Sequence, residues 1–299
     1  MELVTPHPFR SADAKDEYLD LYDRHSQLWP VDAESRTVYT TYGQTFVRIS
    51  GPAGAPPLVL LPGFGTHSLM WIPNIISLSE HFQTFAVDNI CDVGRSVAVR
   101  PMYGPEDFAN WLDGLFDALR LNESINLVGA SFGGWLATLS ALAFPSRLRK
   151  MALLAPAATV LPLSPGFRIR GLLSTLPIAG LRRKLMLWLF SDWQNDQSSR
   201  YLYQIILHDT AVAARCFKQR RTLAQPMVLT DEEWAAIKVP TLYLVGDREK
   251  ICSARKAVAR LNCVAPDIKA EIIPGAGHSL NIVQAAVVNR KLLAFLADT

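Results

Sequence analysis

The amino-acid sequence predicts an α/β protein: a mostly parallel sheet, covered by helices on both faces and interrupted by one helical insertion. Two observations support this fold class. Short, continuously apolar runs alternate with helical segments, and such runs are typical of parallel strands buried on both faces. After Pro156 the alternation stops for much longer than an ordinary connection, so a separate unit is expected there. The expected strands are Leu58 to Leu61, Thr84 to Val87, Ile125 to Val128, Met151 to Leu154 and Thr241 to Val245, with Ala270 to Ile273 as the final strand.

Two elements are expected before this alternation begins. Residues 12–29 carry apolar side chains three or four apart and end at Pro30, which predicts an amphipathic helix. Two β-rich runs, Thr37 to Tyr42 and Thr45 to Ile49, flank Gly43 and Gln44 and predict an antiparallel hairpin.

The insertion divides the chain into a core and a cap. We expect the core to comprise residues 1–156 and 236–299, with a C-terminal helix closing it, and the helical cap to comprise residues 157–235. Residues 157–191 contain no acid, and five cations lie there among apolar side chains. Such a segment fits either a lid that touches lipid or a cap whose apolar face lines a substrate cavity. The cap is favoured, because cations on helices are usually a solvated face.

Composition excludes several classes of protein. The chain has 299 residues, a hydrophobic fraction of 49% and a net charge of +3, which does not suggest nucleic acid as a partner. Its opening residues carry acidic groups and no long apolar run, so a cytoplasmic protein without stable membrane association is expected. Four scattered cysteines form neither a disulfide framework nor zinc-ligand spacing. We therefore expect no metal and no organic cofactor.

The strongest single motif is Gly129-Ala130-Ser131-Phe132-Gly133, which follows an apolar strand and precedes a helical run. A Gly-x-Ser-x-Gly sequence in that setting predicts a nucleophile elbow, with Ser131 at the apex of a strained turn. The small flanking residues let the strand and the helix approach each other. Short patterns of this kind also occur by chance, so the context carries the prediction.

A serine nucleophile needs a base and a group that orients the base. Of the six histidines, His278 has the best context, because it lies in a glycine-flanked loop after the last strand. Asp247 follows the strand Thr241 to Val245, at the end where open α/β sheets build their sites, so it is the expected acid. Asp247 could instead cap a helix, and Glu249 is its nearest rival. His67 could contact substrate.

An oxyanion intermediate needs two backbone donors. The elbow supplies the amide of Phe132, and Phe64, in the glycine-rich loop after Leu61, is expected to supply the second. A phosphate-binding loop is disfavoured, because the lysine and hydroxyl residue of a P-loop are missing.

These motifs together resemble the α/β-hydrolase superfamily over nearly the whole chain after the first helix. The likeness rests on five stretches: 60–65 with Trp71, 85–88 leading to 94–96, 129–133, 244–247 and 275–278. The N-terminal helix and hairpin resemble bacterial carboxylesterases that hydrolyse arylpropionate esters. Pro62 departs from the family, which commonly has histidine there, and Asn89-Ile90-Cys91-Asp92 stands where many relatives have a glycine-rich run.

The resemblance implies a serine carboxylic-ester hydrolase acting on small-to-medium, mostly apolar esters. Its alternatives are other chemistries of the same triad, namely C–C bond hydrolysis, lactone opening, peracid formation and acyl transfer, or a non-catalytic ligand-binding protein. Candidate substrate-binding residues are Gly63, Trp71, Trp135, Phe167 and Trp188.

Overall fold

The computed structural model describes residues 8–122, 124–174, 176, 180–195, 197–218 and 224–297. Its centre is a nine-stranded mixed sheet with the strand order β1-β2-β4-β3-β6-β7-β8-β9, in which β5 pairs with β2 outside this path. The strands are β1 (Glu34–Thr40), β2 (Gly43–Ser50), β3 (Pro57–Leu61), β4 (Gln83–Val87), β5 (Val97–Ala98), β6 (Ile125–Ala130), β7 (Leu148–Leu154), β8 (Thr241–Gly246) and β9 (Lys269–Ile273).

The pairing confirms the predicted fold class. From β4 to β9 all neighbours along the order are parallel, whereas β1 and β2 form the antiparallel hairpin and β2 also pairs antiparallel with β4. The six residues of β6 and of β8 are buried throughout, as expected for strands covered on both faces.

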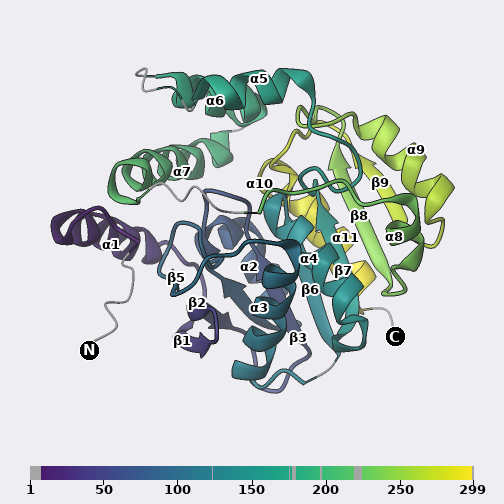
Figure 1. The fold of residues 1–299 in the computed structure, drawn as a ribbon, viewed down its shortest axis with the longest axis horizontal. Helices are drawn as coiled ribbons and strands as arrows, with labels where there is room; N and C mark the ends of the chain where they lie inside the picture. The colour runs from purple at the N-terminus through teal and green to yellow at the C-terminus, as the bar shows by residue number, and fades with distance from the viewer. Residues whose placement is uncertain are drawn as a thin grey trace.

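Helices cover both faces of this sheet (Figure 1). On one face α3 (Pro105–Ala118) packs with α4 (Phe132–Ala143), and on the other α2 (Ile72–Ser79) packs with α11 (Ala285–Ala297). The remaining core helices are α9 (Ala254–Val264) and the short α10 (Leu280–Val283). Three single turns of 3-10 helix lie at Ser68–Trp71, Pro145–Arg147 and Ser191–Asn195.

Between β7 and β8 the chain is helical, in the region expected to form the cap. It contains α5 (Pro165–Ser174), α6 (Leu181–Leu189), α7 (Gln197–Cys216) and α8 (Asp231–Ala236). The α5–α6 pair lies over the carboxyl ends of the strands, and α7 lies beside α1 (Ala12–Ser26) (Figure 1). The N-terminal helix therefore supports the insertion. Within the described residues, no helix is long and apolar enough to cross a membrane.

Candidate active site

Ser131 lies at a sharp turn between β6 and α4. Its backbone has φ 51° and ψ −113°, a conformation that non-glycine residues rarely adopt and that costs about 1–3 kcal/mol. The flanking glycines are required by close backbone contact, because a Cβ atom on Gly129 would lie less than 3.0 Å from Gly133, and one on Gly133 less than 3.0 Å from Leu61. The motif thus forms the predicted elbow, at the carboxyl edge of the sheet.

His278 connects this serine to a carboxylate. Its Nε2 lies 2.8 Å from Ser131 Oγ, and its Nδ1 lies 2.9 Å from an oxygen of Glu249. The side chains of His278 and Glu249 are only 7% and 1% exposed, so water does not compete strongly for these hydrogen bonds. Ser131, His278 and Glu249 form one continuous chain of hydrogen bonds.

The ionisation of Glu249 decides which tautomer of the histidine fits the site. Burial alone would raise the pKa of the Glu249 carboxyl, but attraction to His278 and the hydrogen bonds that it accepts from His278 and from two backbone amides lower that pKa below its ordinary value. Those amides belong to Lys250 and Ile251, at 2.7 and 2.8 Å from the second carboxylate oxygen. An ionised Glu249 can only accept, so Nδ1 carries the proton and Nε2 is free to accept from Ser131.

The prediction that Asp247 orients His278 is wrong. Asp247 is exposed, and its carboxylate accepts a hydrogen bond from the amide of Gly275 at 2.9 Å. The chain makes a turn after β8, in which the amide of Glu249 bonds the carbonyl of Gly246 at 3.2 Å, and this turn brings the third residue under the imidazole. Asp247 instead joins the ends of β8 and β9.

The loop after β3 passes directly over Ser131, since a Cβ on Gly63 would lie 3.4 Å from Ser131 Cβ. Three consecutive amides of this loop could face a substrate. That of Gly63 donates to the sulfur of Met70 at 3.2 Å, and that of Gly65 donates to the carboxylate of Asp92 at 2.9 Å. Among the described residues, the amide of Phe64 has no acceptor, which leaves it available as a donor.

The two expected donors are neighbours in space. Phe132 is the first residue of α4, where backbone amides have no partner within the helix. The rings of Phe64 and Phe132 meet edge to face with centroids 5.9 Å apart, and the Phe64 side chain is 64% exposed. Phe132 follows Ser131 in the elbow, and Phe64 follows Gly63 in the loop that passes over Ser131, so the two residues reach the serine from different segments.

The candidate substrate-binding residues separate into two groups. Trp71 and Trp135 have 0% and 1% of their surface exposed and belong to the core, which argues against direct contact with substrate. Phe167 and Trp188 are partly buried in the apolar cluster of the insertion. The guanidinium of Arg170 lies 4.4 Å from the centre of the Trp188 ring, so a cation covers this residue.

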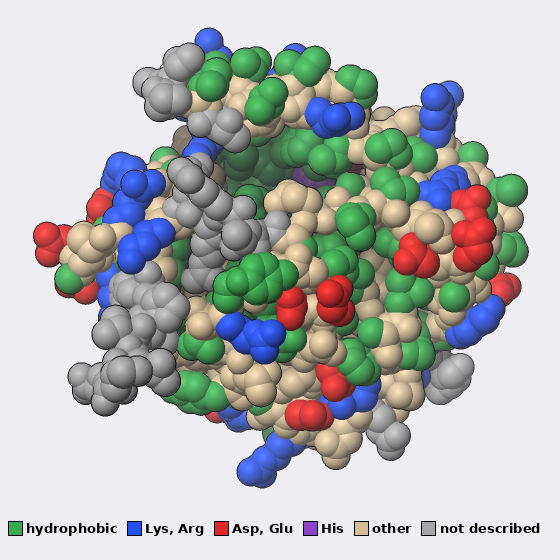
Figure 2. Space-filling model, in the orientation of Figure 1, with side chains coloured by type: hydrophobic (Ala, Val, Ile, Leu, Met, Phe, Trp, Pro, Cys, Tyr) green, Lys and Arg blue, Asp and Glu red, His purple; other side chains and the backbone are tan. Residues whose placement is uncertain are grey.

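The insertion also brings two residues to the site that sequence reasoning missed. Phe190 packs beside the imidazole of His278, with ring centroids 6.5 Å apart. The buried carboxylate of Asp192 accepts a hydrogen bond from the amide of Gly277 at 2.6 Å. No sequence motif marks either one. Figure 2 shows a hollow beneath the α5–α6 pair, with a mainly hydrophobic wall.

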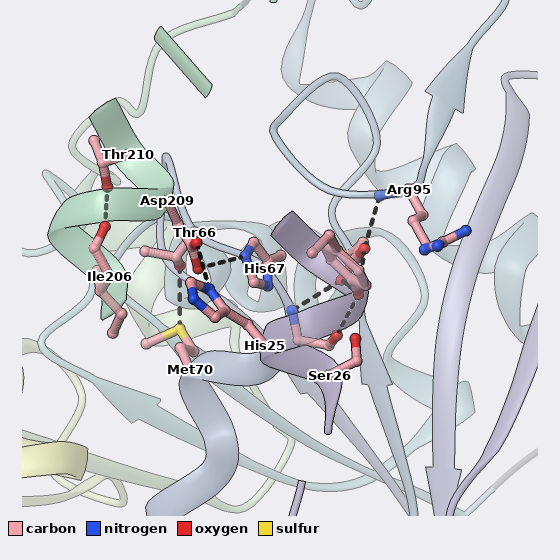
Figure 3. A network of polar contacts seen from close by, with 12 residues as sticks. His25, Ser26, Thr66, His67, Met70, Arg95, Ile206, Asp209 and Thr210 are labelled. Atoms are coloured by element: carbon pink, nitrogen blue, oxygen red, sulfur yellow. Dashed lines mark hydrogen bonds and ion pairs between the residues drawn. The ribbon is translucent and has the colours of Figure 1, made fainter. Parts of the chain in front are cut away.

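His67 contacts a carboxylate of the insertion. Its Nε2 lies 3.3 Å from a carboxylate oxygen of Asp209 on α7, and the other oxygen lies 2.7 Å from His25 Nδ1 on α1 (Figure 3). One buried carboxylate therefore joins the insertion, the N-terminal helix and the loop that follows Phe64. A small, mostly apolar cavity lies between this loop and α7.

Within the described residues no group of three histidine, cysteine or acidic side chains could hold a metal ion. The site joins a serine, a histidine and a buried carboxylate by hydrogen bonds, beneath the loop that carries Phe64. The model of the alpha/beta hydrolase family matches residues 58–290. The chain belongs to the alpha/beta hydrolase family.

Similar proteins share this fold over almost their whole length. A Bacillus subtilis (strain 168) protein described as an uncharacterized carboxylesterase, nap, is 36% identical over 284 residues, covering 93% of this chain and 91% of that protein. Carboxylesterase YbfK of the same organism is 31% identical and covers 96% of both chains. The crystal structure of naproxen esterase from Bacillus subtilis has a TM-score of 0.87 at 34% identity and covers 96% of this chain and 99% of that chain. The resemblance to bacterial carboxylesterases is therefore confirmed.

Proposed function

We propose that this alpha/beta hydrolase is a serine carboxylic-ester hydrolase. The observation that carries the proposal is the chain of hydrogen bonds Ser131–His278–Glu249, at 2.8 and 2.9 Å, with Ser131 at the strained apex of the elbow. The similarity to two proteins named carboxylesterases supports an ester as the substrate.

In the proposed reaction, Ser131 Oγ attacks the ester carbonyl carbon while His278 Nε2 takes its proton. The amides of Phe64 and Phe132 stabilise the negative charge on the carbonyl oxygen. His278 then gives the proton to the leaving alcohol as the ester C–O bond breaks, and an acyl-serine remains. Water, deprotonated by His278, attacks the acyl carbon; the bond between that carbon and Ser131 Oγ then breaks, His278 returns the proton to Oγ, and the acid leaves. Glu249 keeps its charge throughout and stabilises the imidazolium.

The apolar side chains of the insertion also favour one class of substrate. We propose that residues 157–235 form a cap over the site. Phe167 and Trp188 would then affect substrate binding indirectly, by packing within this cap. An apolar cluster lines the underside of the insertion near His278, with Phe190 and Ile251 among its members. Small-to-medium, mostly apolar esters, including aryl esters, fit such surroundings, since apolar pockets favour apolar ligands. No cofactor enters this proposal.

A cytoplasmic location is proposed from the cysteines, because all four are free thiols, as expected in a reducing compartment.

Hydrolysis of p-nitrophenyl esters of increasing chain length tests the proposal, together with labelling by a fluorophosphonate. Wild-type protein should turn over the short esters and take up one label, and Ser131→Ala and His278→Ala should each reduce kcat on the order of a thousandfold or more. A dienone substrate for C–C cleavage and a lactone serve as comparison substrates. Faster turnover of either one than of every ester would contradict the proposal.

A further inference from the structure

The loop that carries Phe64 is held at both ends by the segment that follows β4. At one end the side-chain amide of Asn89 donates to the carbonyl of Pro62 at 2.9 Å. At the other end the amide of Gly65 donates to both oxygens of Asp92, at 2.9 and 3.1 Å. Phe64 lies between these two anchors.

These contacts hold the peptide groups on either side of the one that carries the Phe64 amide. The Phe64 N–H itself shares a peptide group with the Gly63 carbonyl, which accepts from the hydroxyl of Thr66 at 2.8 Å and from its amide at 3.3 Å. The adjoining amide of Gly63 is engaged by Met70, and Gly65 adopts φ 74°, a left-handed conformation that leaves this backbone freer than others. A peptide group free to rotate would present its N–H to the site only part of the time. With the Pro62 carbonyl held by Asn89, the Gly63 carbonyl by Thr66 and the Gly65 amide by Asp92, the Phe64 N–H between them has a set direction.

Both side chains occupy places that are unfavourable for stability alone. Asn89 has 0% of its surface exposed, and within the described residues its side-chain oxygen has no hydrogen-bond partner. Burial raises the pKa of the Asp92 carboxyl to about 7, against hydrogen bonds from the amides of Gly65 and Val93 and the attraction of His67. The unpartnered oxygen of Asn89 and the cost of ionising the Asp92 carboxyl both lower the stability of the fold, so these residues are better explained by the loop that they hold.

We propose that Asn89 and Asp92 are positioning residues for the oxyanion hole, holding the Phe64 amide in the direction that a developing oxyanion requires. The inference rests on the proposed function, since it assigns Phe64 a role in that reaction. Neither side chain needs to touch the substrate. Their effect would act on the transition state, where the charge on the carbonyl oxygen develops, and hardly at all on binding of the neutral ester.

The variants Asp92→Asn and Asn89→Asp test this with almost no change of shape. In Asp92→Asn an NH2 group replaces one of the two oxygens that the Gly65 amide approaches, and in Asn89→Asp a carboxylate replaces the donor to Pro62. The matched control is Asp107→Asn, because Asp107 also accepts from two backbone amides, those of Tyr103 and Gly104, at the start of α3.

For Asp92→Asn we expect kcat for p-nitrophenyl butyrate to fall on the order of 10- to 100-fold, with KM within about twofold of wild type. The Ki of a trifluoromethyl ketone, which forms an oxyanion with the serine, should rise by a similar factor. Asn89→Asp should behave in the same way, and Asp107→Asn should change neither quantity by more than about twofold. An unchanged kcat and Ki, or a rise in KM alone, would overturn the proposal.

Amide hydrogen exchange of the segment 62–66 provides a readout that does not depend on activity. Exchange should be about tenfold faster or more in Asp92→Asn and unchanged in Asp107→Asn. If wild-type protein shows no Ser131-dependent turnover, the proposed function fails, and the exchange result alone decides whether Asp92 anchors this loop. If Asp92→Asn does not fold, Asn89→Asp decides. Failure of both to fold would show that the contacts hold the fold as a whole and would overturn the proposal.

Discussion

Replacing Glu249 by glutamine should nearly abolish turnover, whereas replacing Asp247 by asparagine should not. One oxygen of Glu249 accepts from two amides, those of Lys250 and Ile251, and the other faces His278 Nδ1 at 2.9 Å. In Glu249→Gln the amide oxygen is required at the two backbone donors. The NH2 group must then face the imidazole.

This orientation reverses the tautomer of His278. An NH2 group donates, so Nδ1 becomes the acceptor and the proton moves to Nε2, which can no longer take the proton of Ser131. For this change we expect kcat to fall on the order of 10³- to 10⁴-fold, which corresponds to about 4–5.5 kcal/mol of transition-state stabilisation. Asp247 is exposed and accepts one hydrogen bond, from Gly275, which an asparagine oxygen can also accept. Asp247→Asn should therefore keep kcat within about threefold of wild type.

The assay is steady-state hydrolysis of p-nitrophenyl butyrate, normalised to the fraction of protein that is folded. Proton NMR of the imidazole N–H should show that the strongly deshielded Nδ1 proton of wild type is lost in Glu249→Gln and kept in Asp247→Asn. A loss of a thousandfold in Asp247→Asn together with near-normal turnover in Glu249→Gln would refute the assignment of the acid.

Three further predictions concern the surroundings of the site. Asp92 is partly buried and its carboxyl has a pKa of about 7 in the folded protein, so its ionisation destabilises the fold as pH rises from about 4 to 7. The stability of Asp92→Asn should therefore increase relative to that of wild type between pH 5 and pH 8, by no more than about 2 kcal/mol after solvent screening. Urea unfolding of both proteins at the two pH values measures this change. If the free energy of unfolding differed between variant and wild type by the same amount at both pH values, this prediction would be contradicted. Asp209→Asn weakens the contacts of α7 with His25 and His67, so unfolding stability should fall by about 1–3 kcal/mol, and KM should rise more than kcat falls. If neither KM nor the midpoint of urea unfolding changed, the contacts of Asp209 would contribute neither to stability nor to substrate binding. The rate of tributyrin hydrolysis should rise smoothly through the solubility limit; a sharp increase when the emulsion forms would identify the insertion as an interfacial lipase lid.

The sheet and the nucleophile could be predicted from local sequence. A strand buried on both faces is mostly apolar, so β3, β4, β6, β7 and β8 are all recognisable as short, mainly apolar runs. The elbow is recognisable because its small residues meet backbone only a few positions away: Gly129 meets Gly133 in the same turn. His278 follows from its glycine-flanked loop at the end of the last strand.

The identity of the acid depended on tertiary structure. Asp247 and Glu249 lie two residues apart after the same strand, and both are carboxylates that could orient a histidine. The turn after Gly246 decides between them, because it directs Asp247 to Gly275 and brings Glu249 beneath His278. Sequence position alone cannot determine the direction of a side chain in an irregular loop.

The support of the site likewise comes from segments far apart in the chain. Asn89 and Asp92 touch the loop at Pro62 and Gly65 only because β3 and β4 are neighbours in the sheet. Phe190 and Asp192 reach the histidine loop only because the insertion folds back over the strand ends. The sequence by itself determined the strands, the elbow and the base, since these depend on nearest neighbours and periodicity. The tertiary structure decided which carboxylate bonds His278 and which residues hold the loop of Phe64, because hydrogen bonds between distant loops leave no regular pattern in sequence.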